Sequence, residues 1–284
     1  MSLYEDSKPW YGQDGDTAWY RSYPNHTTLY TSKPAPFRSS LQGSGKIPAS
    51  WNLYKPSWTG PFVIGEHRDV PLLAVTRHSG ILGRPRLTFY AGSDKKSPVS
   101  ATVIKPSAAL HNKHNFQIIM PSTQADEYTI RKPNDVVEVH VNISRRDVKY
   151  MFNVRVGRGW ERWTQTFEWR YIQGRDIQLL RQHNDESFHH GLGQLTGGWA
   201  LYKVAGSRPG TFPALCREND EIVAVWGEPS IMTDAKATFA FLNSGADGQL
   251  GHQFSNLAVI TALAIWDEQQ RQSAQRQMDV EYGN

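Results

Sequence analysis

Cysteine is nearly absent from this chain of 284 residues: Cys216 is the single one, so no disulfide can form within the chain. Residues 1–15 are polar and aromatic and lack the apolar stretch of a secretory signal peptide. Both absences favour a reducing compartment. We therefore expect an intracellular, cytoplasmic protein, with the nucleus or a membrane surface as alternative locations.

Long hydrophobic runs are also scarce. The most pronounced, residues 257–266, is apolar on every side of a helix but covers only about half of the roughly 20 residues that cross a bilayer. Ser255 precedes it as a candidate N-cap, and charged side chains follow from Asp267 onward. We predict a buried helix over about residues 255–272, with a solvent-exposed tail. Burying its large side chains contributes on the order of 10 kcal/mol at most.

Regular periodicity is missing from residues 1–50, where prolines are mixed with Ser, Gly and Asp. This composition predicts a disordered arm. Its aromatic side chains are numerous for a passive linker and are candidates for docking on a protein partner: Trp10, Tyr11, Trp19, Tyr20, Tyr23 and Tyr30. A flexible tail without a partner is the alternative.

Residues 51–284 consist mainly of short alternating segments separated by Gly, Pro, Asn and Asp. Residues 137–143 and 150–156 predict a hairpin, and residues 163–171 extend it to a three-stranded meander. The predicted strands are residues 62–64, 72–76, 87–90, 101–104, 116–120, 127–130, 137–143, 150–156, 163–171, 177–180, 199–204, 221–226 and 237–242.

A helix that is apolar on all sides restricts how these strands can pack. An open sheet covers one side of a helix, whereas a closed barrel covers every side and leaves no strand edge unpaired. We therefore predict a mainly β domain over residues 51–284: a closed antiparallel barrel of about twelve strands that encloses the C-terminal helix. A two-sheet sandwich around the helix is the nearest alternative.

Two local motifs carry a family resemblance: Phe-Glu-Trp-Arg at residues 167–170 and Gly-Trp-Ala-Leu-Tyr at residues 198–202. Together with the order of strands followed by an apolar helix, they make residues 51–272 similar to the tubby C-terminal-like superfamily. That superfamily includes tubby domains, LURP-one-related proteins and phospholipid scramblases. The resemblance implies a barrel with a buried central helix, no catalytic centre in the tubby and LURP-one branches, and, in tubby domains, a basic surface that binds phosphoinositide headgroups.

In tubby domains a Lys/Arg-rich loop after a strand ending in Ala-Gly supplies part of that basic surface. The matching segment here is residues 87–97, in which Lys95 and Lys96 are basic and Asp94 offsets one of them. Arg84 and Arg86 lie just before the same strand. Because a phosphate group needs two or three converging cations, these four residues are the candidate lipid-headgroup site. Ordinary solvated turns are the alternative interpretation.

A second basic cluster, Arg145, Arg146 and Lys149, lies at the predicted hairpin turn and is open to the same two interpretations. The formal net charge of the whole chain is +4, a small excess for its length. Attraction to phosphates is therefore allowed by the composition without being required by it.

The densest group of potential metal ligands is His183, Asp185, Glu186, His189 and His190. A zinc site would need three or four of them to converge from one irregular loop. We expect no metal and no other cofactor, and we keep a metal-dependent enzyme that uses this loop as an alternative function.

Aromatic residues also raise nucleic acid as a partner, since Trp163, Trp169 and Tyr171 alternate along a strand that carries Arg170, with Arg162 just before it. In a barrel wound around a helix, however, large aromatics on one face of a strand are better explained as core. Nucleic-acid binding is therefore disfavoured.

From these features we expect a monomeric, non-enzymatic, intracellular adaptor or regulator that binds anionic phospholipid headgroups at the membrane surface. A scramblase-like lipid-transport protein, with the C-terminal helix in the bilayer, is the first alternative. The metal-dependent enzyme is the second.

Overall fold

The computed structural model describes the chain from residue 47 onward, with gaps. The described residues are 47–57, 59–79, 85–105, 115–121, 135–144, 147–156, 163–174, 176–178, 180, 195, 197–205, 220–229 and 234–282. The predicted arm therefore lies outside the described residues, except for its last four positions.

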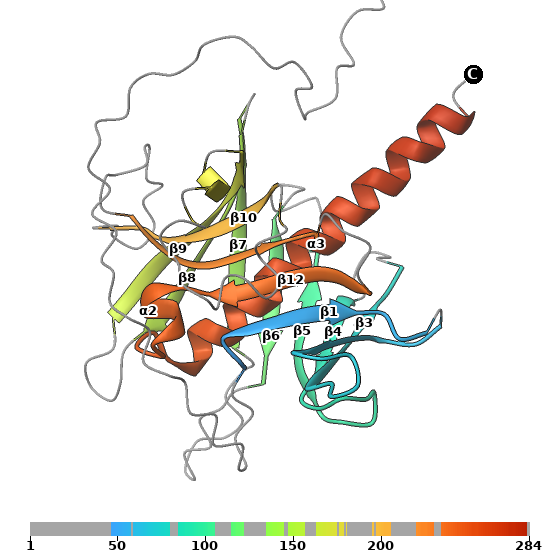
Figure 1. Cartoon of the computed structure of the whole chain (residues 1–284), viewed down its shortest axis with the longest axis horizontal. Coiled ribbons are helices and arrows are strands. Elements are labelled where there is room, and N and C mark those ends of the chain that lie inside the picture. Colours follow the sequence, from blue (N-terminus) through green and yellow to red (C-terminus); the bar gives the residue numbers. More distant parts are fainter. Residues whose placement is uncertain are drawn as a thin grey trace, which may run out of the picture.

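Within the described residues, twelve strands form one closed antiparallel barrel (Figure 1). Each strand pairs with its neighbours in sequence, as alternating hydrophobicity with short connections predicts. The strands are β1 (Ser50–Tyr54), β2 (Phe62–Gly65), β3 (Leu73–Arg77), β4 (Pro85–Tyr90), β5 (Val99–Ile104), β6 (Phe116–Met120), β7 (Asp135–Ile143), β8 (Val148–Val156), β9 (Trp163–Gln173), β10 (Gly197–Lys203), β11 (Glu221–Gly227) and β12 (Ala235–Phe241).

The first and last strands close the barrel. Ser50 lies opposite Ala240 and Asn52 lies opposite Thr238, whose hydroxyl donates a 2.8 Å hydrogen bond to the Asn52 side chain. This seam pairs both edges of the sheet, so the closed barrel is confirmed and the two-sheet sandwich is wrong.

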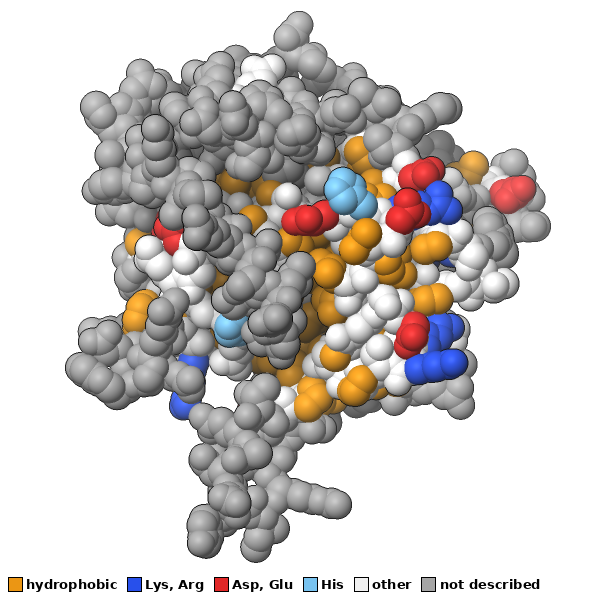
Figure 2. Space-filling model, turned by 60° about the horizontal axis from the view of Figure 1, so that its bottom comes forward, with side chains coloured by type: hydrophobic (Ala, Val, Ile, Leu, Met, Phe, Trp, Pro, Cys, Tyr) orange, Lys and Arg blue, Asp and Glu red, His pale blue; other side chains and the backbone are white. Residues whose placement is uncertain are grey.

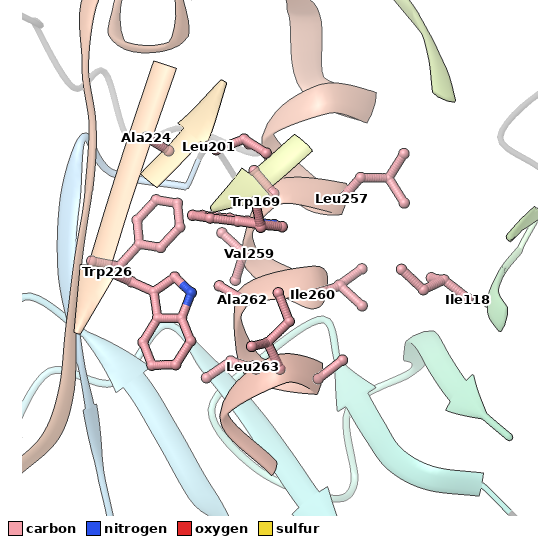
Figure 3. Close-up of a cluster of buried hydrophobic side chains, with 14 of the residues drawn as sticks. Ile118, Trp169, Leu201, Ala224, Trp226, Leu257, Val259, Ile260, Ala262 and Leu263 are labelled. Atoms are coloured by element: carbon pink, nitrogen blue, oxygen red, sulfur yellow. The ribbon is translucent and has the colours of Figure 1, made fainter. Parts of the chain in front are cut away.

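The C-terminal helix occupies the interior. A short helix, α2 (Asn243–Ala246), leads into α3 (Gly251–Tyr282), and residues 257–267 of α3 are all buried. Figure 3 shows α3 side chains reaching the wall on opposite sides, with Ile260 toward Ile118 and Val259 toward Trp169. Beyond residue 271 the helix is exposed and projects from the barrel (Figure 1).

Inward-facing aromatic side chains fill the space between helix and wall. Phe167 and Phe254 have ring centroids 4.6 Å apart, Trp51 stacks on Phe239 at 4.8 Å, and Trp169 is fully buried. Trp163, predicted to share this core face, is instead 50% exposed, because it is the first residue of β9 and lies at the end of the barrel.

The helix boundaries differ from the prediction. Helix α3 begins at Gly251, whose φ of +81° is readily adopted only by glycine, so Ser255 is not the N-cap but lies one turn inside the helix. Asp267, predicted to begin the wet tail, is 1% exposed because arginines at the end of the barrel enclose it.

Every observed strand except β1 overlaps a predicted segment, and the meander β7–β8–β9 is confirmed. The strand predicted at residues 177–180 is wrong: the described positions 176–178 and 180 are helical. Ile177 and Leu180, three residues apart, pack together on the outside of the barrel, which fits a helical turn. The strand predicted at residues 127–130 lies outside the described residues.

Candidate functional site

The barrel has two ends that differ in chemistry. At one end, called here the α2 rim, β12 leads into α2 and α3 enters the barrel. Because neighbouring strands are antiparallel, the turn that joins β4 to β5 lies at this same end. At the other end, called here the exit rim, α3 leaves past Arg77, at the end of β3, and Arg86, near the start of β4. The candidate lipid-binding residues divide between these two ends.

Lys95 and Lys96 lie in the turn between β4 and β5 at the α2 rim, and both are exposed. The Asp94 carboxylate accepts hydrogen bonds from the backbone N–H of Lys96 at 2.7 Å and of Ser97 at 3.1 Å, which fixes the turn. Among the described residues no ion pair involves either lysine, so both ammonium groups face solvent.

Arg86 is directed to the exit rim, four residues before Tyr90, which places it about 13 Å along the strand from the start of the lysine turn. Its guanidinium is occupied by two carboxylates of α3, and its side chain is only 11% exposed. Arg84 lies outside the described residues. The structure therefore brings Lys95 and Lys96 together but does not bring Arg86 to them.

A buried carboxylate organises the exit rim. Asp267 accepts from Arg77 Nε at 2.5 Å and from Arg271 Nε at 2.8 Å, and Arg86 Nη2 lies 3.4 Å away. Arg271 also donates to the backbone carbonyls of His78 and Ser79. These contacts tie the helix to the β3–β4 end of the barrel at the point where it reaches water.

Glu268 extends this network to β5, because Arg86 Nη1 contacts it at 2.5 Å and Lys105 Nζ lies 3.9 Å from it. Burial raises the pKa of Glu268, but the positive charges of Arg86 and Lys105 and hydrogen bonds from Arg86 and Gln272 outweigh burial and lower the pKa below its usual value. The carboxylate is thus ionised and held. In the sequence this network is visible only as an acidic pair, Asp267 and Glu268, directly after the apolar run. We interpreted that pair as the start of a solvent-exposed tail.

The other basic cluster is also partly engaged. Lys149 lies 3.4 Å from Glu168 and 3.5 Å from Asp147, whereas Arg145 and Arg146 lie outside the described residues. Figure 2 shows a comparable mixing of charge on the face it presents, where the blue groups at the right edge lie beside red side chains.

Outward-facing residues of the Phe-Glu-Trp-Arg motif form a covered ionic chain on the barrel wall. Arg170 binds Glu168 at 2.6 Å and Asp220 at 2.8 Å, and its guanidinium carbon lies 4.2 Å from the Tyr202 ring centroid. Arg170 is only 8% exposed. The residue that suggested a nucleic-acid platform is therefore committed to internal contacts.

The histidine-rich loop, residues 183–190, lies outside the described residues. Among the residues that are described, no group of three or more His, Cys, Asp or Glu side chains is placed to hold a metal ion. No helix in the same part of the chain is long and apolar enough to cross a membrane.

Neither a family model, nor a curated protein sequence, nor a solved structure matches this chain. The architecture alone defines the structural class of this chain. In the described residues, twelve antiparallel strands form a closed barrel around the C-terminal helix. The likeness to the tubby C-terminal-like superfamily remains a resemblance carried by the motifs and the order of elements.

Proposed function

We propose that this protein is a non-enzymatic adaptor or regulator that attaches to anionic membrane surfaces through the β4–β5 turn. The observation that carries the proposal is the state of Lys95 and Lys96: both are exposed and free of ion pairs among the described residues, while Asp94 is held by the turn backbone. A stiff turn that presents two neighbouring ammonium groups suits the phosphates of lipid headgroups.

The filled lumen supports binding at the outside of the barrel rather than inside it. Residues 257–267 of α3 occupy the interior, so a ligand can reach only the rims and the outer wall. Two lysines near an anionic membrane contribute about 2 kcal/mol, roughly a thirtyfold preference, which suits reversible peripheral attachment.

The fold argues against the scramblase-like alternative. The apolar turns of α3 are enclosed by the barrel, and insertion into a bilayer would require withdrawing them from contacts with the wall, such as the hydrogen bond from Trp169 to Thr261. For the metal-dependent alternative, metal content of the purified protein is the direct measurement, because stoichiometric zinc would require converging ligands.

Vesicle flotation tests the proposal. We expect the wild type to float with phosphatidylcholine vesicles that contain a phosphoinositide, and recovery to fall to the level of pure phosphatidylcholine in a Lys95→Ala, Lys96→Ala variant. A Lys236→Ala, Arg155→Ala variant removes the same charge from exposed positions elsewhere on the barrel and should float like the wild type. Equal recovery with anionic and neutral vesicles would contradict the proposal.

A further inference from the structure

A cavity of about 240 Å³ opens at the exit rim between the barrel wall and the emerging part of α3. Its apolar side is formed by β6, β7, β8 and β10, with Phe116, Val141, Tyr150 and Trp199 as the main lining residues. Its polar side is formed by consecutive turns of α3, which contribute Glu268, Gln269, Gln272 and Arg276. The cavity is thus apolar on one wall and polar on the other.

A buried donor without an acceptor lies in the apolar wall. Trp199 is 4% exposed, and its Nε1–H has no hydrogen-bond partner among the described residues. The centroid of the Trp199 ring lies 5.2 Å from the ring centroid of Tyr150 and 5.6 Å from that of Tyr171, and both pairs meet edge to face. That N–H is shielded from a water-sized group, so Trp199 contributes apolar ring surface, and no hydrogen-bond donor, to the wall of the cavity.

The charges around the cavity favour an anion. Among the described residues, the adjoining ion network holds four cations, Arg77, Arg86, Lys105 and Arg271, and two carboxylates, those of Asp267 and Glu268. Glu268 also lines the cavity, and its charge is offset by Arg86 and Lys105. Arg276 adds a further positive charge at the cavity, and no ion pair involves it among the described residues. A guanidinium at the mouth of an apolar pocket is suited to a carboxylate.

We propose that this cavity binds a small anionic amphiphile: an apolar chain of about seven carbons that ends in a single carboxylate, as in a medium-chain fatty acid. The size follows from the volume, since 240 Å³ corresponds to about eight water-sized groups at about 30 Å³ each. The apolar body lies against Phe116 and Val141, and the carboxylate reaches Arg276 and accepts from a glutamine amide of α3.

This site is independent of the proposed membrane attachment, because the lysine turn lies at the opposite end of the barrel. Octanoate is the probe, and its binding is measured by calorimetric titration. A second measurement follows the indole N–H resonance of Trp199 by NMR in ¹⁵N-labelled protein. This resonance is assigned as the one that disappears in the Trp199→Phe variant. We expect saturable binding of octanoate, a shift of that resonance, and markedly weaker binding of octanol, which lacks the charge.

Arg276→Gln is the matched test, because Arg276 is exposed and its replacement should leave folding intact. We expect it to weaken octanoate about tenfold, as loss of one charge-assisted contact would, while Lys95→Gln makes the same charge change at the α2 rim and leaves octanoate affinity unchanged. Equal affinity of octanol and octanoate, an unaffected Arg276→Gln variant, or no shift at Trp199 would each overturn the assignment. A Trp199 shift caused by phosphatidylcholine vesicles but not by octanoate would overturn it as well, in favour of a membrane lipid chain.

Discussion

The indole Nε1 of Trp169 donates a 2.8 Å hydrogen bond to the hydroxyl of Thr261, and Thr261 Oγ1 lies 2.7 Å from the carbonyl oxygen of Leu257. Thr261 is the polar side chain within the apolar run 257–266 of α3, and it is 0% exposed. This contact sets the depth and rotation of the helix in the barrel, because one polar atom on the wall meets one polar atom on the helix.

Replacing Thr261 by valine should therefore destabilise the protein. The shape is nearly kept, but Trp169 Nε1–H is left buried without an acceptor, at a cost of about 1–3 kcal/mol. Thr261→Ser keeps the hydroxyl and should cost less. Chemical denaturation of the two variants beside the wild type measures this difference. Equal loss in both would show that stability does not depend on the hydrogen bond made by the hydroxyl.

Loss of the Asp267 carboxylate should be more damaging. Asp267→Asn leaves Arg77, Arg86 and Arg271 facing a neutral amide in a nearly closed site, and breaking such a buried pair costs about 3 kcal/mol or more. Asp279→Asn, on the exposed end of α3, makes the same chemical change and should alter stability by less than about 0.5 kcal/mol. Thermal unfolding of both variants compares the two positions, and similar effects would show that the ion network is not structural.

Acid should weaken the exit rim through Glu268. Its pKa is lowered from the usual 4.5 in the folded protein, so its carboxylate stabilises the fold above about pH 4.5, and this contribution is lost as the pH falls through the lowered value. We expect the difference in unfolding free energy between the wild type and Glu268→Gln to be largest near neutral pH and to shrink below about pH 4.5. Glu281→Gln, on the exposed end of α3, is the control, and a difference that does not depend on pH would contradict the linkage.

Gly198 should not tolerate a side chain. A Cβ atom at this position would lie 2.4 Å from the carbonyl oxygen of Trp226 on the neighbouring strand β11, so the backbone would have to move. Overpacking of this kind costs about 1–3 kcal/mol. Gly92→Ala is the milder comparison, because the nearest atom there is the Ser97 hydroxyl, which can rotate. Urea denaturation midpoints that fall equally in the two variants would argue against a specific constraint at the β10–β11 pair.

The core helix, most strands and the closed barrel could be predicted from the sequence. The alternation of apolar and polar residues in strands, and a helix that is apolar on all sides, are properties of neighbouring residues and require no knowledge of tertiary contacts. Strand β1 was missed because Pro48 and Pro56 flank it and its buried residues Leu53 and Tyr54 are adjacent, which breaks the alternation. The short helical turn at Ile177 was mistaken for a strand because the sequence has apolar residues both two positions (Leu179) and three positions (Leu180) after Ile177. So short a segment fits the period of a strand and that of a helix.

The exit rim could not be predicted in the same way. Arg77 and Asp267 are separated by 190 positions, so their contact depends on the register of the barrel and the depth of α3 rather than on neighbouring residues. The cavity beside Trp199 likewise arises from four strands and the helix together. That Lys95 and Lys96 lie in a turn between two strands could be predicted, because such a turn is a local feature of the sequence.

Helix α3 follows all twelve strands in the chain, and this order has a consequence for biosynthesis. The ribosome delivers all twelve strands before the segment that fills them, and the seam partners Ser50 and Ala240 also meet late. Until residues 257–267 emerge, the nascent sheet has no interior to close on, and its apolar faces are open to chaperones or to other chains. A chain that ends between Phe241 and Leu257 would contain all twelve strands without the helical segment that fills them, so its apolar strand faces would stay open.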